Sequence, residues 1–237
     1  MTELGTGDRL VVLVHGVLDR GRSFAKVAEL LSDECTMLTY DRRGYGASLD
    51  APGSPADVHG QIADVVTILD GRRAVLVGHS FGGVIAAGAA VRCPDLVDAL
   101  VMYESGPAWA PGWDDTTMRA VLGGPDPVEA GLQLMLGDQL ASMPEETQAR
   151  WRRLAAAFVA EESSTRLPTI PFDFADLCMP VVYGASENVP FIPIVAHLRA
   201  VAAAEIVEMP GAGHNAHRDA PEAFADLVRL ALRRSAA

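Results

Sequence analysis

The sequence predicts an α/β fold, with a mostly parallel sheet of about six strands, helices on both faces and a helical lid insertion. Short apolar runs alternate with longer amphipathic segments along the 237 residues, which is typical of a parallel sheet covered by helices. The chain is 49% hydrophobic and 21% charged, as in ordinary globular domains. A chain of this length can bury a substantial core.

Short apolar runs predict the strands, and the amphipathic segments between them predict the helices. The predicted strands are Leu10 to Val14, Thr36 to Tyr40, Ala74 to Val77, Ala99 to Tyr103, Pro180 to Tyr183 and Glu205 to Glu208. The predicted helices are 22–32, 57–70, 82–92, 192–203 and 221–233. Prolines at 94 and 221 mark the end of one helix and the first turn of another.

A long insertion separates the fourth and fifth predicted strands, from about Ser105 to Asp176. It is too long for an ordinary connection, and residues 126–136 and 144–162 have helical patterns. We therefore expect a core domain of 1–104 and 177–237, and a helical lid (cap) of 105–176. Ligands of open α/β sheets bind beyond the carboxyl ends of the strands, so this insertion is expected to cover the binding crevice.

The net charge and the cysteine content indicate which binding partners and which cellular compartment to expect. The formal net charge of −12 repels nucleic acid and anionic lipid, so we expect neither partner. We expect a small-molecule substrate, and the residues predict no particular oligomeric state. The three cysteines have no metal-ligand spacing, which favours reduced thiols. Residues 1–8 lack the features of a signal peptide, and 10–14 is too short to span a membrane, so we expect a cytoplasmic protein.

The strongest local motif is AVLVGHSFGG at 74–83, a buried strand that runs into Gly-His-Ser-Phe-Gly and then a helix rich in small residues. A serine hydroxyl is a poor nucleophile unless a tight turn presents it beside a base, and Gly78 and Gly82 leave room for such a turn. The plainer alternative is a serine that caps the helix in an ordinary turn. We predict that Ser80 is a nucleophile.

Three further motifs occur in a characteristic order: VHGV at 14–17, DRRGYGAS at 41–48 and PGAGH at 210–214. With the serine motif, they make the chain resemble the α/β-hydrolase fold family over almost its whole length. The resemblance implies the order nucleophile, acid, histidine, with His214 as the general base for Ser80. It also implies an oxyanion hole made by the backbone N–H groups of Phe81 and Val17.

Two residues compete for the role of the acid. The usual family position, three residues beyond a glycine after the fifth predicted strand, falls on Glu187 in the segment Gly184-Ala185-Ser186-Glu187. Some family members carry the acid after the preceding strand, where this chain has Glu104. A carboxylate at the end of so apolar a run is costly without a partner such as an imidazole. Either glutamate could instead be a solvated loop residue, and both remain candidates.

The remaining motif residues are expected to have structural roles. We expect His15 to pack beneath the oxyanion loop and His79 to pack behind the nucleophile. The loop that begins at Asp41-Arg42-Arg43 is expected to brace the turn beneath the active site. The remaining histidines, which have no motif around them, are expected at the surface: His59, His197 and His217.

These features predict a cofactor-free and metal-free hydrolase that cleaves a carboxylic ester or lactone of a small, largely apolar molecule through an acyl-enzyme. The histidines, cysteines and acids have no zinc spacing, and no glycine-rich loop matches a dinucleotide site. One alternative is a C–C bond hydrolase or lyase, and another is a non-catalytic protein that binds a small molecule. Dehalogenase and epoxide-hydrolase chemistry would need aspartate in place of Ser80.

Overall fold

The computed structural model describes residues 1–167, 171–186 and 192–235 and contains a seven-stranded sheet. The strand order is β1-β3-β2-β4-β5-β6-β7. The strands are β1 (Thr2–Leu4), β2 (Leu10–Val14), β3 (Thr36–Thr39), β4 (Ala74–His79), β5 (Val97–Tyr103), β6 (Val181–Ala185) and β7 (Glu205–Glu208). All neighbouring pairs are parallel except β1 and β3. The mostly parallel α/β fold is thus confirmed.

The edge strand β1 is the one strand that the sequence did not predict. Its three residues are all exposed, so they carry no apolar alternation, and their backbone pairs antiparallel with β3. The other six strands lie where the apolar runs predicted them, with ends that differ by at most two residues. Strands were predicted from runs of buried apolar residues, so a short edge strand with only exposed residues could not be predicted in this way.

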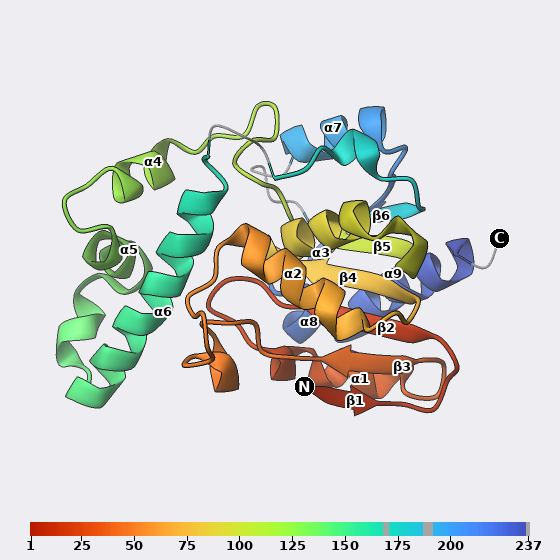
Figure 1. Ribbon diagram of the computed structural model, residues 1–237, viewed down its shortest axis with the longest axis horizontal. Coiled ribbons are helices and arrows are strands. Elements are labelled where there is room, and N and C mark those ends of the chain that lie inside the picture. Colours follow the sequence, from red (N-terminus) through yellow and green to blue (C-terminus); the bar gives the residue numbers. More distant parts are fainter. Residues whose placement is uncertain (168–170, 187–191, 236–237) are drawn as a thin grey trace.

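Helices cover both faces of the sheet (Figure 1). The strand residues alternate between two cores: in β2, Val12 packs with α2 (Val58–Leu69) and α3 (Phe81–Arg92), whereas Leu13 packs with α1 (Ala25–Leu31) and α9 (Pro221–Arg234). Helix α7 (Ile192–Val201) joins the first core, and the short α8 (Ala216–Asp219) joins the second. Burial on both faces explains why the central strands are continuously apolar.

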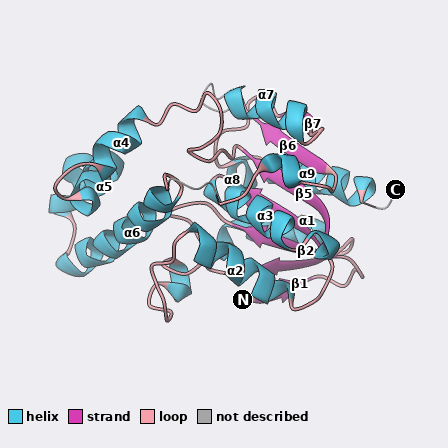
Figure 2. Cartoon of the chain, turned by 45° about the horizontal axis from the view of Figure 1, so that its top comes forward, coloured by secondary structure: helices cyan, strands magenta, loops and turns pink. Residues whose placement is uncertain are grey.

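The residues between β5 and β6 form α4 (Thr116–Leu122), α5 (Pro127–Leu136) and α6 (Glu145–Ser164), with short 3-10 segments at Gly137–Ser142 and Phe174–Asp176. Leu132, Leu140 and Ala155 form a small apolar cluster within this insertion. In Figure 2 these helices lie on the side toward which the arrows of β5 and β6 point. The predicted domain boundaries, 105 and 176, stay a prediction. Within the described part of the chain, no helix has the length and apolar character needed to cross a membrane.

Candidate active site

Ser80 lies at the turn between β4 and α3 with an unusual backbone conformation, φ 53° and ψ −128°. Hydrogen bonds hold this turn: the Ser80 N–H donates to the carbonyl oxygen of Tyr103 (2.9 Å), and the carbonyl oxygen of Ser80 accepts from the Gly83 N–H (2.9 Å) and the Ser105 hydroxyl (2.6 Å). A positive φ is rare for residues other than glycine and persists only where the surroundings impose it. Ser80 is therefore held in a strained, fixed conformation at the carboxyl end of a central strand.

The glycines on either side allow this turn. A Cβ atom at Gly78 would lie 2.3 Å from the Cα atom of Gly83, and one at Gly82 would lie 2.1 Å from the carbonyl oxygen of Val14. Both distances are far below van der Waals contact, and the obstructing atoms belong to the backbone. A side chain at 78 would therefore push the start of α3 away from β4, and one at 82 would push it away from the end of β2.

Glu104 follows β5 directly, as Ser80 follows β4, and the register pairs His79 with Tyr103, so the two residues occupy equivalent places on neighbouring strands. Glu104 is fully buried and also has a positive φ, 43°. Its Oε2 atom lies 2.7 Å from Nδ1 of His214. With Nδ1–H as the donor, Nε2 of His214 carries the ring's lone pair and is the nitrogen that can act as a base.

Other groups hold this pair in place. The backbone N–H and the hydroxyl of Ser186 both donate to Oε1 of Glu104, so the two carboxylate oxygens have separate partners. The Tyr103 hydroxyl donates to the carbonyl oxygen of Gly213 at 2.8 Å, next to His214. The structure thus brings Glu104 and His214 together. The other candidate acid, Glu187, lies outside the described residues.

The loop after β2 packs closely against the serine turn. A Cβ atom at Gly16 would lie 3.0 Å from Cβ of Ser80. The carbonyl oxygen of Gly16 accepts from Nη2 of Arg42 (2.9 Å) and lies 2.8 Å from Nδ1 of His15. A peptide unit is planar, and its C=O and N–H point in opposite directions. Fixing the Gly16 carbonyl therefore also fixes the direction of the Val17 N–H, one of the two predicted oxyanion donors.

His15 has one tautomer that satisfies all its contacts. Nδ1–H donates to the Gly16 carbonyl, and Nε2 accepts from the backbone N–H of Arg42 at 3.0 Å. Burial lowers the pKa of His15 to about 3, so the imidazole is neutral at physiological pH. The prediction that His15 packs beneath the oxyanion loop agrees with these contacts. The second predicted donor, Phe81, is the first residue of α3 and is buried.

Arg42 is fully buried, and its charge is matched by Glu161 from α6. The Tyr45 hydroxyl (2.8 Å) and the Gln61 amide nitrogen (2.9 Å) also donate to the Glu161 carboxylate. Burial raises the pKa of Glu161, whereas the charge and hydrogen bonds of Arg42 oppose that rise. Arg42 therefore contacts both the Gly16 carbonyl oxygen and Glu161 of α6, and so links the loop after β2 to the long helix between β5 and β6.

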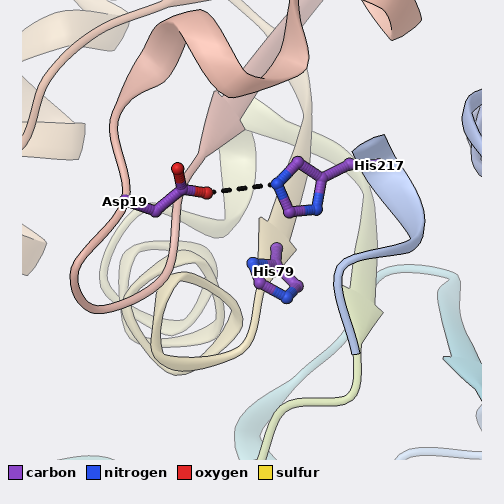
Figure 3. A group of neighbouring side chains, drawn as sticks. All are labelled: Asp19, His79 and His217. Carbon is purple, nitrogen blue, oxygen red and sulfur yellow. Dashed lines mark hydrogen bonds and ion pairs between the residues drawn. The ribbon is translucent and has the colours of Figure 1, made fainter. Parts of the chain in front are cut away.

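A second buried polar cluster consists of Asp19, His79 and His217 and lies next to the loop that carries His214 (Figure 3). Asp19 and His217 are joined through Oδ2 and Nε2 at 3.1 Å, and the ring of His217 lies 4.4 Å from that of His79, between centroids. His79 in turn places Nε2 2.7 Å from the carbonyl oxygen of His214. The prediction that His217 lies at the surface is wrong: its side chain is fully buried. No local pattern could have predicted this burial, because the partner Asp19 is 198 residues away along the chain.

Within the described part of the chain, Asp19, His79 and His217 also have the spacing of a metal site, with candidate ligand atoms within 4.8 Å of one another. The carboxylate of Asp19, however, already accepts from Ser23, His217 and Arg218. Burial opposes ionisation of Asp19, but hydrogen bonds from His217 and Ser23 lower its pKa below the usual range. The protein's own donors thus satisfy this carboxylate, whereas among the described residues Nδ1 of His79 and Nδ1 of His217 are buried without a hydrogen-bond partner.

A sequence profile of the alpha/beta hydrolase family matches residues 11–227. The chain belongs to this family. Family membership, together with the strained serine turn and the paired glutamate and histidine, supports a hydrolase.

Individual relatives agree with this assignment. The chain is 36% identical over 108 residues to 2-(acetamidomethylene)succinate hydrolase from Mesorhizobium japonicum, which covers 44% of this chain and 38% of that protein. In the curated relatives compared, this chain spans 29% to 52% of their length.

Two solved structures have the same fold. An esterase from Thermogutta terrifontis superimposes with a TM-score of 0.75 at 22% identity, over 99% of this chain and 92% of the other. The enol-lactonase from Burkholderia xenovorans LB400 gives a TM-score of 0.70 at 19% identity, over 98% and 95%. At this level of identity, both likenesses concern the fold alone.

Proposed function

We propose that the chain is a serine hydrolase that cleaves a carboxylic ester or lactone of a small molecule through an acyl-enzyme. The observation that carries the proposal is the 2.7 Å contact between the buried carboxylate of Glu104 and Nδ1 of His214. A carboxylate in this position orients the imidazole and stabilises the imidazolium that forms when His214 takes a proton. Glu104 is fully buried, whereas the side chain of His214 is 40% exposed, so the imidazole is accessible from the solvent side while its partner carboxylate is held inside.

The proposed reaction uses these residues in two steps. The hydroxyl oxygen of Ser80 attacks the carbonyl carbon while Nε2 of His214 takes its proton, and the negative charge on the carbonyl oxygen is stabilised by the N–H groups of Val17 and Phe81. The C–O bond to the alcohol breaks, and the alcohol leaves with the proton from His214. Water then attacks the acyl-enzyme with the same base, which releases the acid and restores Ser80.

The test is covalent labelling with a fluorophosphonate, combined with steady-state hydrolysis of 4-nitrophenyl butyrate. Wild type is expected to be labelled and to turn over many times, and Ser80→Ala to do neither. Glu104→Gln is expected to lower kcat by about 10³- to 10⁴-fold, because the amide cannot balance the imidazolium. Glu187→Gln is the matched control and is expected to retain activity.

Each contrary outcome removes a different part of the proposal. An unlabelled wild type would exclude the serine nucleophile. Loss of activity in Glu187→Gln but not in Glu104→Gln would transfer the acid to Glu187. Labelling without multiple turnovers would favour a binding protein that has kept a reactive serine.

A further inference from the structure

A pocket of about 330 Å³ lies between α6 and the loops that carry Val17 and His214. Its volume is in the range of about 300–1,000 Å³ that is usual for small-molecule sites. Leu18, which lines it, directly follows Val17, and Arg218, which also lines it, is four residues beyond His214. A ligand in this pocket would therefore lie against the two loops that hold the proposed oxyanion donor and the proposed base.

Three arginines from three separate segments line this pocket: Arg20 after β2, Arg150 on α6 and Arg218 on α8. Among the described residues, the side chains of Arg20 and Arg150 have no ion-pair or hydrogen-bond partner. Arg218 pairs with Asp19, which is the one carboxylate among the described lining residues. The chain as a whole has 31 acidic and 19 basic residues, so this excess of positive charge is opposite to that of the molecule. Such a concave, positively charged site attracts anions.

Arg150 lies on the face of α6 that lines the pocket. Thr147, Arg150, Trp151 and Leu154 are spaced so that they share one face of α6, and all four line the pocket. The same face continues to Phe158 and Glu161, which are buried, and Glu161 pairs with Arg42 of the core. Arg150 is exposed but borders the pocket from this face of α6, and its guanidinium has no carboxylate to neutralise it in the described part of the chain.

The lining combines this charge with apolar surface. Trp151 and Leu154 from α6 are half-buried and face the same pocket as the arginines. Guanidinium groups bind carboxylates through paired, charge-assisted hydrogen bonds, and a tryptophan ring packs against a hydrocarbon chain. The pocket therefore has the chemistry to bind an organic acid that has both a carboxylate and an apolar segment.

We propose that this pocket, which we call the arginine pocket, binds a carboxylate of the substrate. The substrate would be an ester or lactone whose acyl part ends in a carboxylate, and the product would be a dicarboxylic acid or a hydroxy acid with a second carboxylate. The catalytic part of this inference rests on the proposed function. Binding of a carboxylate does not, because it requires no reaction at Ser80.

The kinetic test compares an anionic ester, mono-4-nitrophenyl glutarate, with a neutral ester of the same shape, 4-nitrophenyl 5-methylhexanoate. Wild type is expected to prefer the anionic ester in kcat/KM by at least about tenfold, since a hydrogen bond to a charged group contributes that much or more. Arg150→Gln and Arg20→Gln are each expected to reduce this ratio by about tenfold. Arg233→Gln is the matched control: it removes an equal charge from α9, far from the pocket, and should leave the ratio unchanged.

The binding test uses calorimetric titration of monomethyl glutarate into Ser80→Ala protein, which cannot hydrolyse the ligand. Arg150→Gln in this background is expected to weaken binding by about tenfold, and Arg150→Lys to restore part of it because the charge is retained. Thermal unfolding of each variant checks that the fold is intact.

The two tests separate the two proposals. Equal kcat/KM for both esters in wild type, or binding that Arg150→Gln does not weaken, would overturn the arginine pocket and leave the proposed function standing. Binding that depends on Arg150, in a protein that hydrolyses neither ester and resists the fluorophosphonate, would keep the pocket and overturn the proposed function.

Discussion

The Nε2 atom of His79 lies 2.7 Å from the carbonyl oxygen of His214, so the residue before the proposed nucleophile holds the backbone of the proposed base. The two imidazole rings also pack, with centroids 4.8 Å apart. Because a carbonyl oxygen only accepts, Nε2 of His79 must carry the proton. Burial lowers the pKa of His79 well below its usual value, which keeps the ring neutral beside His214.

Replacing His79 by phenylalanine should therefore impair catalysis more than folding. The ring packing is kept, but the hydrogen bond to the His214 backbone is lost, and a bond of this kind contributes about 0.5–1.5 kcal/mol. We expect kcat for 4-nitrophenyl butyrate to fall by about three- to tenfold with a smaller change in KM. Steady-state kinetics measure this, with His59→Phe as the control. An unchanged kcat would show that the hydrogen bond does not position the base.

The buried pair of Arg42 and Glu161 predicts a large effect on stability. Glu161→Ala leaves the Arg42 guanidinium buried without a counter-charge, and breaking such a pair typically costs about 3–5 kcal/mol. Urea unfolding should show this loss. The exposed pair of Arg153 and Asp50 provides the control, since Arg153→Ala should cost less than about 1 kcal/mol. A loss for Glu161→Ala no larger than the control's would mean that water reaches Arg42 in solution.

A double variant of Arg42 and Glu161 can distinguish the effect of this pair on stability from its effect on the orientation of the Val17 N–H. Replacing both Arg42 and Glu161 by methionine removes both charges, so much of the lost stability should return. The carbonyl of Gly16 would still lack its Arg42 donor. We expect kcat to remain about tenfold or more below wild type in this double variant, because a displaced oxyanion donor typically costs about 10²-fold or more. Recovery of both stability and kcat would exclude the orienting role.

Acid should destabilise the fold before the carboxylates titrate. The pKa of His15 is lowered from 6.5 to about 3 by burial, so between these values the unfolded chain binds a proton that the folded protein does not. The free energy of unfolding should therefore decrease as the pH falls below about 6.5, by about 1.4 kcal/mol per pH unit for each such histidine. His79 contributes with the same sign. Urea unfolding at pH 7, 6 and 5 measures the slope, which should become shallower in His15→Gln. An equal slope in that variant would contradict the assignment.

The serine turn predicts a steric effect at Gly82. The added methyl group in Gly82→Ala would lie 2.1 Å from the Val14 carbonyl oxygen, so β2 and the turn must separate and Ser80 must move. We expect fluorophosphonate labelling to slow by more than about 10²-fold, since misplacement of about 1 Å can cost that much. Gly131→Ala on α5 is the control: its nearest neighbour would be 3.7 Å away, an ordinary contact. Fast labelling of Gly82→Ala would show that the turn adapts.

The sequence predicts well what is encoded locally. The six strands with buried residues, the serine turn and the order of motifs each depend on a few neighbouring residues, and Ser80 and His214 could be chosen from such segments. The helices of 126–136 and 144–162 were predicted for the same reason, and α5 and α6 begin and end within two residues of these bounds. Even the exposed β1 was missed for a local reason, namely the absence of a buried face.

Contacts between residues that are far apart along the chain could not be predicted from local sequence patterns. The choice between Glu104 and Glu187 depends on which carboxylate meets the His214 ring, and Glu104 is 110 residues away from it along the chain. The burial of His217 depends on Asp19, 198 residues away. Arg20, Arg150 and Arg218 are far apart along the sequence and line one pocket only in the folded chain. Chain folding, and not residue type, creates these pairs.

By the predicted boundaries, the insertion begins at Ser105, directly after Glu104, and the backbone N–H and carbonyl oxygen of Ser105 both contact the hydroxyl of Tyr183. This arrangement defines where a chimera can be spliced. A foreign cap grafted after Ser105 would keep the carboxylate, its strained backbone and the serine turn, so specificity could be exchanged without rebuilding the reactive groups. A graft that begins at Ser105 would remove the hydroxyl that donates to the Ser80 carbonyl oxygen, and one that begins at Glu104 would also remove the carboxylate that contacts His214.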